Sequence, residues 1–132
     1  MFGKNKKANG KIDTLIGQNT EIRGDVVFTG GLHVDGVIKG NVAAAQDGSS
    51  MLSLSERGRI EGEVRVPNLV LNGVVTGDVY SGNHIELAPK SRITGNLYYK
   101  MLEMAGGAEV NGQLVRRAAE AGSGETSTET AE

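Results

Sequence analysis

Ile60-Glu61-Gly62-Glu63-Val64 is one of six pentapeptides in this chain that share one pattern. A β-branched residue is followed by any residue, a glycine, an acid or amide, and an aliphatic residue. The other five copies begin at Ile22, Ile38, Val75, Ile93 and Val110. Successive glycines lie 15 to 22 residues apart. A near-constant period of this size indicates stacked supersecondary units rather than one irregular globular domain.

A pair of residues at alternate positions, nearly always apolar, precedes each glycine. The pairs are Thr14 and Ile16, Leu32 and Val34, Leu52 and Leu54, Leu69 and Leu71, Ile85 and Leu87, and Leu102 and Met104. Alternation with period two is typical of a β-strand. In the second and fourth copies the pair lies two residues nearer the glycine, and Asp35-Gly36 or Asn72-Gly73 follows. These dipeptides suit turn positions with positive φ, so we expect a tight corner there.

The repeat unit is too short for a β-strand, crossover helix and second strand, which need about 30 residues. A single winding could not bury its apolar face, but windings stacked about 4.8 Å apart would align the apolar positions in internal columns. Ile22, Ile38, Ile60, Val75, Ile93 and Val110 form one expected column, and Val26, Val42, Val64, Val79, Leu97 and Leu114 form the next. The sequence therefore predicts an all-β, single-domain parallel β-helix, a solenoid of about six windings and roughly 29 Å in length.

Composition and charge divide the chain into three parts. Its 132 residues include 20 glycines, two prolines and no cysteine, which suits one glycine-cornered domain. Residues 1–13 are basic, 14–116 hold the repeats, and 117–132 are acidic without a large apolar residue, so we expect both flanks to be disordered tails. No apolar run approaches the ~18 residues of a transmembrane helix, and no signal-peptide core is present. We therefore expect a cytoplasmic protein.

The residues offer little support for catalysis. His33 and His84 each lie beside inward positions, so both should point outward without converging. Outward acids such as Asp25, Glu61 and Asp78 keep an alternative open: a small β-helical carbohydrate-binding or calcium-dependent enzyme module. Such β-helical enzymes have much longer chains, and a solvated face is the favoured interpretation. The chain has no phosphate-binding glycine motif and a pI of 5.7, so we expect no enzyme activity, cofactor, nucleotide or nucleic acid.

The two ends of the rod are the first candidate functional surfaces. Terminal windings present unpaired backbone groups over an apolar layer, and the flanking sequence contains no amphipathic helix to cover them. We expect these ends to join copies into a homopolymer by strand addition. The residues assigned to the polymerisation ends are Leu15, Ile16, Ile22, Leu102, Met104, Val110 and Leu114. The alternative is a monomer or dimer whose tails fold back as caps.

Two further surfaces are candidates. Met1, Phe2, Lys4, Lys6 and Lys7 combine apolar and basic residues, which favours attachment to an anionic membrane; a merely solvated basic tail is the alternative. Phenylalanine at position 2 excludes N-myristoylation. Arg65, Tyr80 and Tyr98 follow equivalent aliphatic positions in successive windings, so they predict an outward patch for a partner or for lateral contact, with ordinary surface decoration as the alternative.

Six [IV]-x-G-[DNEQ]-[VL] units between two tails, after an N-terminal Met-Phe-x-Lys, resemble the bactofilins, which are bacterial cytoskeletal proteins. The resemblance implies a right-handed β-helix of triangular section that polymerises without nucleotide into non-polar filaments. It also implies attachment to the inner leaflet of the cytoplasmic membrane through Met1, Phe2, Lys4 and Lys7, with Lys6 adding charge. The implied partners are the protein itself and cell-wall synthesis or remodelling proteins. The longer interval around 43–50 departs from uniform windings.

Overall fold

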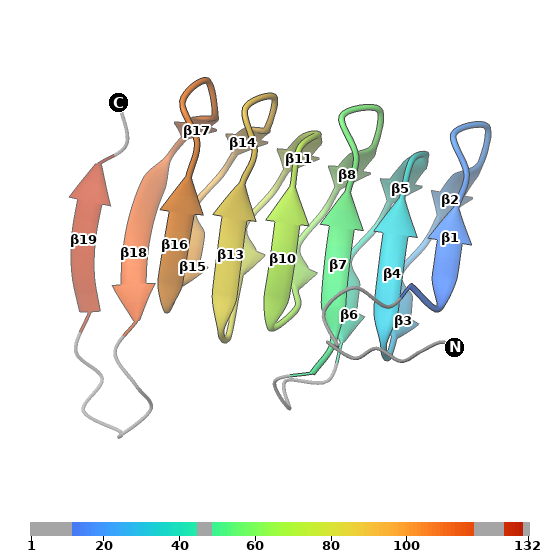
Figure 1. Ribbon diagram of the computed structural model, residues 1–132, viewed down its shortest axis with the longest axis horizontal. Coiled ribbons are helices and arrows are strands. Elements are labelled where there is room, and N and C mark those ends of the chain that lie inside the picture. The colour runs from blue at the N-terminus through green and yellow to red at the C-terminus, as the bar shows by residue number, and fades with distance from the viewer. Residues whose placement is uncertain (1–11, 45–48, 118–125, 131–132) are drawn as a thin grey trace.

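The described part of the chain is a three-sided parallel β-solenoid. A computed structural model describes residues 12–44, 49–117 and 126–130, with side chains for all but the last of these segments. The strands run along three faces, and successive windings stack along the long axis of the molecule (Figure 1). Each winding contributes one strand to each face, so neighbouring strands come from consecutive windings, except for the last strand, β19, which follows β18 in the same sheet.

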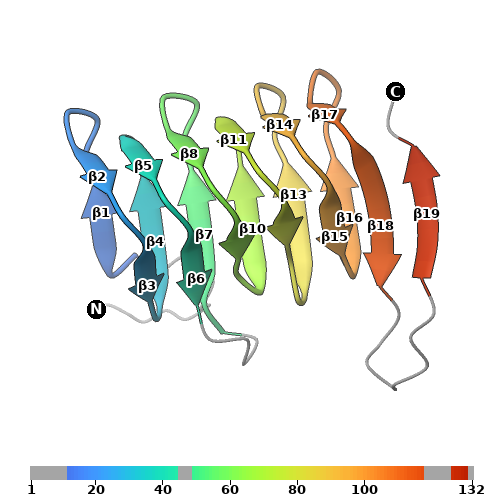
Figure 2. The ribbon, with the colours of Figure 1, turned by 180° about the vertical axis from the view of Figure 1, so that it is seen from behind.

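The three sheets are called A, B and C. Sheet A contains β1 (Thr14–Ile16), β4 (Gly31–Val34), β7 (Met51–Leu54), β10 (Asn68–Leu71), β13 (His84–Leu87) and β16 (Met101–Met104). Sheet B contains β2 (Glu21–Arg23), β5 (Val37–Lys39), β8 (Arg59–Glu61), β11 (Val74–Thr76), β14 (Arg92–Thr94) and β17 (Glu109–Asn111). Sheet C contains β3 (Val26–Phe28), β6 (Val42–Ala44), β9 (Val64–Arg65), β12 (Val79–Tyr80), β15 (Leu97–Tyr99), β18 (Gln113–Arg117) and β19 (Thr126–Thr130). Figure 2 shows sheets B and C from behind.

The strand register matches the apolar columns expected from the repeat. In sheet B, Ile38 pairs with Ile22 on one side and Ile60 on the other, and the column continues to Val110. In sheet C the column runs in the same way from Val26 to Leu114. The predicted parallel β-helix of about six windings is therefore confirmed.

The core lies inside the solenoid and is almost entirely aliphatic. Central inward residues such as Ile60, Val75 and Leu87 have no exposed surface. Two of the three buried serines donate hydrogen bonds to backbone carbonyl groups: Ser81 Oγ donates to the carbonyl oxygen of Pro67 at 3.0 Å, and Ser91 Oγ donates to that of Ala88 at 2.9 Å. The buried residues therefore serve to pack the core.

The repeated glycine forms the corner between sheets B and C. Gly62 has a φ of +152°, and a Cβ atom there would overlap the carbonyl group of Gly40 in the winding below. The following acid or amide links one winding to the next: Asn41 Oδ1 accepts a hydrogen bond from Glu63 N at 2.9 Å. Asp25 and Asp78 accept equivalent bonds from the next winding. These links between windings were not predicted from the sequence.

The tight corners of the second and fourth windings occur where they were expected, but for a different reason. Two residues connect β4 to β5, and two connect β10 to β11. The expectation of positive φ at Gly36 and Gly73 was wrong, because neither is among the glycines with positive φ. Instead, a Cβ atom on Gly36 would overlap the carbonyl oxygens of Gly17 and Thr20. Close approach of neighbouring windings requires glycine there.

Strand β19 differs from the expectation of an unstructured acidic tail. Residues 126–130 pair antiparallel with β18, from Arg117 opposite Thr126 to Gln113 opposite Thr130. Every other strand pairing described is parallel. The physical reason is the edge of β18, whose backbone groups can bond an extended segment of almost any sequence.

Candidate assembly surfaces at the ends of the solenoid

The N-terminal end of the solenoid is formed by β1, β2 and β3. Each is the outermost strand of its sheet, and within residues 12–44, 49–117 and 126–130 no strand pairs with its outer edge. An edge strand presents a row of backbone donors and acceptors to any strand that can align with it. The first winding is thus a template for strand addition on three faces.

Apolar side chains are exposed around this first winding. Ile22, Val26 and Phe28 occupy or flank the inward columns but are only partly buried, because none of the described windings lies beyond them. Leu15 and Val27 point outward between inward neighbours and are 61% and 80% exposed. The end therefore offers apolar surface on its face and around its rim.

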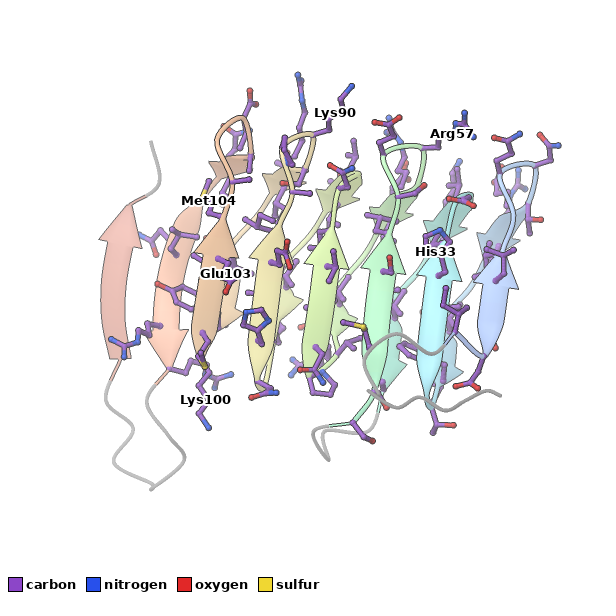
Figure 3. All side chains as sticks on the ribbon, in the orientation of Figure 1. His33, Arg57, Lys90, Lys100, Glu103 and Met104 are labelled. Atoms are coloured by element: carbon purple, nitrogen blue, oxygen red, sulfur yellow. The ribbon has the colours of Figure 1, made fainter. Side chains whose placement is uncertain are left out.

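The C-terminal end is formed by β16, β17 and the pair β18–β19. β16 and β17 are the outermost strands of sheets A and B, whereas β19 extends sheet C by one strand. On sheet A, Met104 is 41% exposed although it continues the inward column of Leu87, and Met101 is 57% exposed on the outer side. Figure 3 shows Met104 on the last strand of sheet A.

The residues assigned to the polymerisation ends lie in the two terminal windings, but not all of them face the open ends. Ile16, Val110 and Leu114 are buried, while Ile22 and Leu102 are partly buried. Leu15 lies on the outer flank of sheet A, beside His33. Sequence reasoning missed three exposed apolar residues, namely Ile12, Val27 and Met101. Alternation within β3 could have identified Val27, since Val26 and Phe28 take the inward positions.

A stack of side chains runs along the outer face of sheet C. The rings of Tyr80 and Tyr98 are 4.6 Å apart with an interplanar angle of 3°. Arg65 Cζ lies 4.1 Å from the centroid of the Tyr80 ring, and Arg117 Cζ lies 5.8 Å from that of Tyr98. Arg65 also donates to Glu63 Oε2 at 2.8 Å. The structure thus brings together the three residues singled out from the sequence and adds Arg117 as a fourth.

Burial raises the pKa of the Tyr80 hydroxyl, and the negative charge of Glu63 raises it further. The phenol therefore stays neutral. The ring faces of the stack are covered by one another and by the guanidinium groups. What remains for a partner is the polar rim of hydroxyl and guanidinium groups.

The outer face of sheet A carries a polar cluster centred on His33. Its Nδ1 lies 3.1 Å from Ser53 Oγ, and its Nε2 lies 3.2 Å from Asp35 Oδ1. A hydrogen bond from Ser55 lowers the pKa of Asp35, and His33 and Arg57 lower it further. Serine, histidine and aspartate are the residue types of a hydrolytic triad, but Ser53 lies in the middle of a sheet whose backbone donors pair with β4 and β10.

His33 and His84 point outward from sheet A, as expected, and they do not converge. His84 Nε2 lies 3.7 Å from Glu103 Oε2. Among the described residues, no group of three or more histidine, aspartate or glutamate side chains could hold a metal ion. The outward acids named as calcium candidates include Asp25 and Asp78, whose oxygens accept corner hydrogen bonds from Asn41 and Asn96.

The long corners between sheets A and B are linked to one another. Arg57 Nη1 donates to Gln18 Oε1 at 3.0 Å, and Lys90 Nζ lies 3.6 Å from Glu56 Oε1. In each case a long corner reaches across the tight corner between them, and Figure 3 shows Arg57 and Lys90 along the same edge of the rod. These contacts join one winding to another.

The proposed membrane-targeting residues, Met1, Phe2, Lys4, Lys6 and Lys7, lie outside the described residues. In the part of the chain that the structure describes, no helix is long and apolar enough to cross a membrane.

The fold and its surfaces define a solenoid repeat protein in which, among the described residues, the most exposed large apolar side chains lie in the terminal windings. The chain belongs to the bactofilin family, whose model, described as polymer-forming cytoskeletal, matches residues 14–115. The chain is also similar to bactofilin BacO of Myxococcus xanthus (strain DK1622), with 24% identity over 102 residues that cover 77% of this chain and 78% of the relative. A comparison with solved structures found no significant match. The protein is therefore a polymer-forming cytoskeletal protein of a structural family.

Proposed function

We propose that this protein assembles end to end, without nucleotide, into filaments on the inner face of the cytoplasmic membrane, where they position cell-wall synthesis or remodelling proteins. One observation carries the end-to-end assembly. All five large apolar side chains that are most exposed among the described residues belong to the first or last winding: Ile12, Leu15, Val27, Met101 and Met104. In the described part of the central windings, in contrast, no large apolar residue is exposed to this degree.

The terminal windings can supply the free energy of a joint. Complete burial of a Val, Phe or Met side chain contributes about 1.5 to 3 kcal/mol. Each backbone hydrogen bond formed between edge strands adds a net of about 0.5 to 1.5 kcal/mol. Val26, Phe28 and Met104 are partly exposed, so several such terms are available at each joint to offset an association cost of about 4 to 15 kcal/mol.

Assembly of this kind needs no energy source. Strand addition between preformed edges is driven by the contacts themselves, as in other cases of β-augmentation. The sequence contains no phosphate-binding glycine motif. The joint repeats the geometry that already holds one winding to the next.

Membrane attachment is assigned to the N-terminal tail. Insertion of Phe2 would contribute about 1.5 to 3 kcal/mol, and each lysine near an anionic leaflet about 1 kcal/mol. One copy would bind weakly. A filament carries many tails, and each attachment after the first is effectively intramolecular, so the assembled form would bind firmly.

We assign partner binding to the outer faces of sheets B and C. They carry the charged pairs of sheet B, such as Lys39 with Glu21 at 3.6 Å, and the Arg65–Tyr80–Tyr98–Arg117 stack of sheet C. The stack extends along the rod axis, so in a filament it would recur once per copy. A surface that recurs at regular intervals along the filament suits the binding of a recruited protein or of a second filament that lies alongside.

Electron microscopy of the purified protein tests the assembly. Negatively stained samples should show filaments after nucleotide has been removed enzymatically, and light scattering should rise with protein concentration. A protein that stays monomeric across concentration and salt would refute the proposal. Pelleting with anionic liposomes tests the anchor separately: Phe2→Glu should abolish co-sedimentation of filaments, and Asn5→Gln, which preserves charge and polarity, should not.

A further inference from the structure

We propose that strand β19 is an internal competitor for the C-terminal joint: the segment Thr126–Thr130 occupies the edge of sheet C that a second copy must use. This inference rests on the end-to-end assembly proposed above. In this proposal the acidic tail has a role of its own: it hinders the addition of another copy at the C-terminal end.

The register of β19 makes it a direct competitor. All five residues of β18 are paired, from Gln113 opposite Thr130 to Arg117 opposite Thr126. A hydrogen-bonding edge can hold one strand at a time, so a strand from another copy cannot add to β18 while β19 is in place. Figure 1 shows β19 at the end of the molecule, outside β18 and opposite to it in direction.

Strand β19, called the cap below, covers only one of the three sheets at this end. β16 and β17 remain the outermost strands of sheets A and B among the described residues. Among the inward residues at this end, Met104 on sheet A is 41% exposed, whereas Val110 on sheet B and Leu114 beside β19 are only 8% and 6% exposed. An incoming copy can therefore make its first contacts on sheet A before β19 leaves.

The composition of β19 suits a displaceable strand. Its sequence, Thr-Ser-Thr-Glu-Thr, has no large apolar residue, so its attachment depends mainly on backbone hydrogen bonds. A second copy brings the same backbone bonds together with apolar contacts from its own terminal winding. The tail is nevertheless tethered through residues 118–125, which keeps its effective concentration on the order of millimolar.

Charge favours the closed form in the free protein. β18 ends in Arg116 and Arg117, and the 15 residues after it carry four glutamates and no basic residue. Arg117 is also held over the ring of Tyr98, with 5.8 Å between Cζ and the ring centroid. This contact lies at the last position of β18, which extends over five residues while the other strands of the sheet before it span two or three.

The critical concentration for assembly measures the competition. When only a fraction of the molecules is competent, the apparent affinity falls by that fraction. A cap that is closed nine-tenths of the time would raise the critical concentration about tenfold. The N-terminal end has no equivalent strand within the described residues, so the effect belongs to one end only.

Four proteins test the inference: the full chain, the chain ending at Arg117, the full chain with Ser127→Pro and Thr128→Pro, and a control with Ala121→Pro and Gly122→Pro. Alternate residues of an edge strand direct their N–H groups at the partner, so adjacent prolines in β19 remove one such donor whichever residue carries it. Pelleting should give a critical concentration about tenfold lower for the truncated chain and the β19 variant than for the full chain and the control.

Hydrogen exchange below the critical concentration provides a readout that does not depend on assembly. The amides of β18 should exchange faster in the truncated chain and in the β19 variant than in the full chain. Equal critical concentrations or equal exchange in all four proteins would overturn the inference while leaving end-to-end assembly standing. If none of the four assembles at any concentration, the proposed function fails and the inference fails with it.

Discussion

The ring of Tyr80 stacks on that of Tyr98, 4.6 Å from centroid to centroid and within 3° of parallel. This separation is close to the spacing of about 4.8 Å between neighbouring strands, so the register of the solenoid imposes the stack. A centroid distance of 4.6 Å lies within the range of about 4.5 to 7 Å that is typical of interacting aromatic pairs. Here Arg65 and Arg117 cover the outer ring faces.

The stack should contribute measurable coupling between its two tyrosines. We expect Tyr80→Ala and Tyr98→Ala each to lower the free energy of unfolding. In a double-mutant cycle the coupling should be about 0.5 to 1.5 kcal/mol, as for other aromatic pairs. Urea denaturation provides the measurement. A control cycle between Tyr80→Ala and Glu103→Ala, on different sheets, should be additive; additivity in the tyrosine cycle too would contradict the stack.

The corner glycine of the third winding should not tolerate a side chain. Gly62→Val should destabilise the fold by about 1 to 3 kcal/mol or more, because φ is +152° and the new Cβ would overlap the carbonyl group of Gly40. Gly106→Val is the matched control, since a Cβ atom there has nothing within 4 Å and φ is not positive. Thermal unfolding of both variants checks this, and a loss at Gly106 as large as that at Gly62 would refute it.

A charge introduced at the open C-terminal end should block assembly without unfolding the protein. Met104→Arg should abolish filaments and leave the melting temperature within a few degrees, because the side chain is 41% exposed in the last winding. Glu86→Arg, on the outer face of the same sheet in the winding before, should preserve assembly. Ile60→Arg should unfold the protein, since it places an unpaired charge in a fully buried position. Filaments of normal length from Met104→Arg would exclude this end as a joint.

Asp35 should contribute stability that is lost in acid. Its pKa is lowered in the folded protein, first by the hydrogen bond from Ser55 and then by the nearby charges of His33 and Arg57. The contribution is therefore complete above the unfolded carboxyl pKa of about 4 and disappears as the pH falls through the lower folded value. Melting temperatures of the wild type and Asp35→Asn should differ most near neutral pH and converge below about pH 3. A difference that is independent of pH would contradict the prediction.

The windings were predictable because burial alone determines them. A column such as Ile38, Ile60 and Val75 needs only period-two alternation and a regular glycine to be recognised, and the register follows from keeping aliphatic residues inside. Gly36 shows the limit of this reasoning. The sequence indicated a tight corner. The structure shows that glycine is required there because neighbouring backbone atoms leave no room for a Cβ atom, and not because φ is positive.

The sequence by itself determined the all-β class, the stacking of about six windings and the outward positions of Arg65, Tyr80 and Tyr98, because alternation and period follow directly from which side chains avoid water. Only the tertiary structure decided which terminal residues are exposed, how His33 meets Ser53 from the next winding, and where β19 pairs. The burial of a side chain at an end of the rod depends on what lies beyond the last strand. Backbone pairing at a sheet edge depends on whether a strand can align with that edge, and not on the identity of its side chains. Neither property leaves a pattern in the sequence.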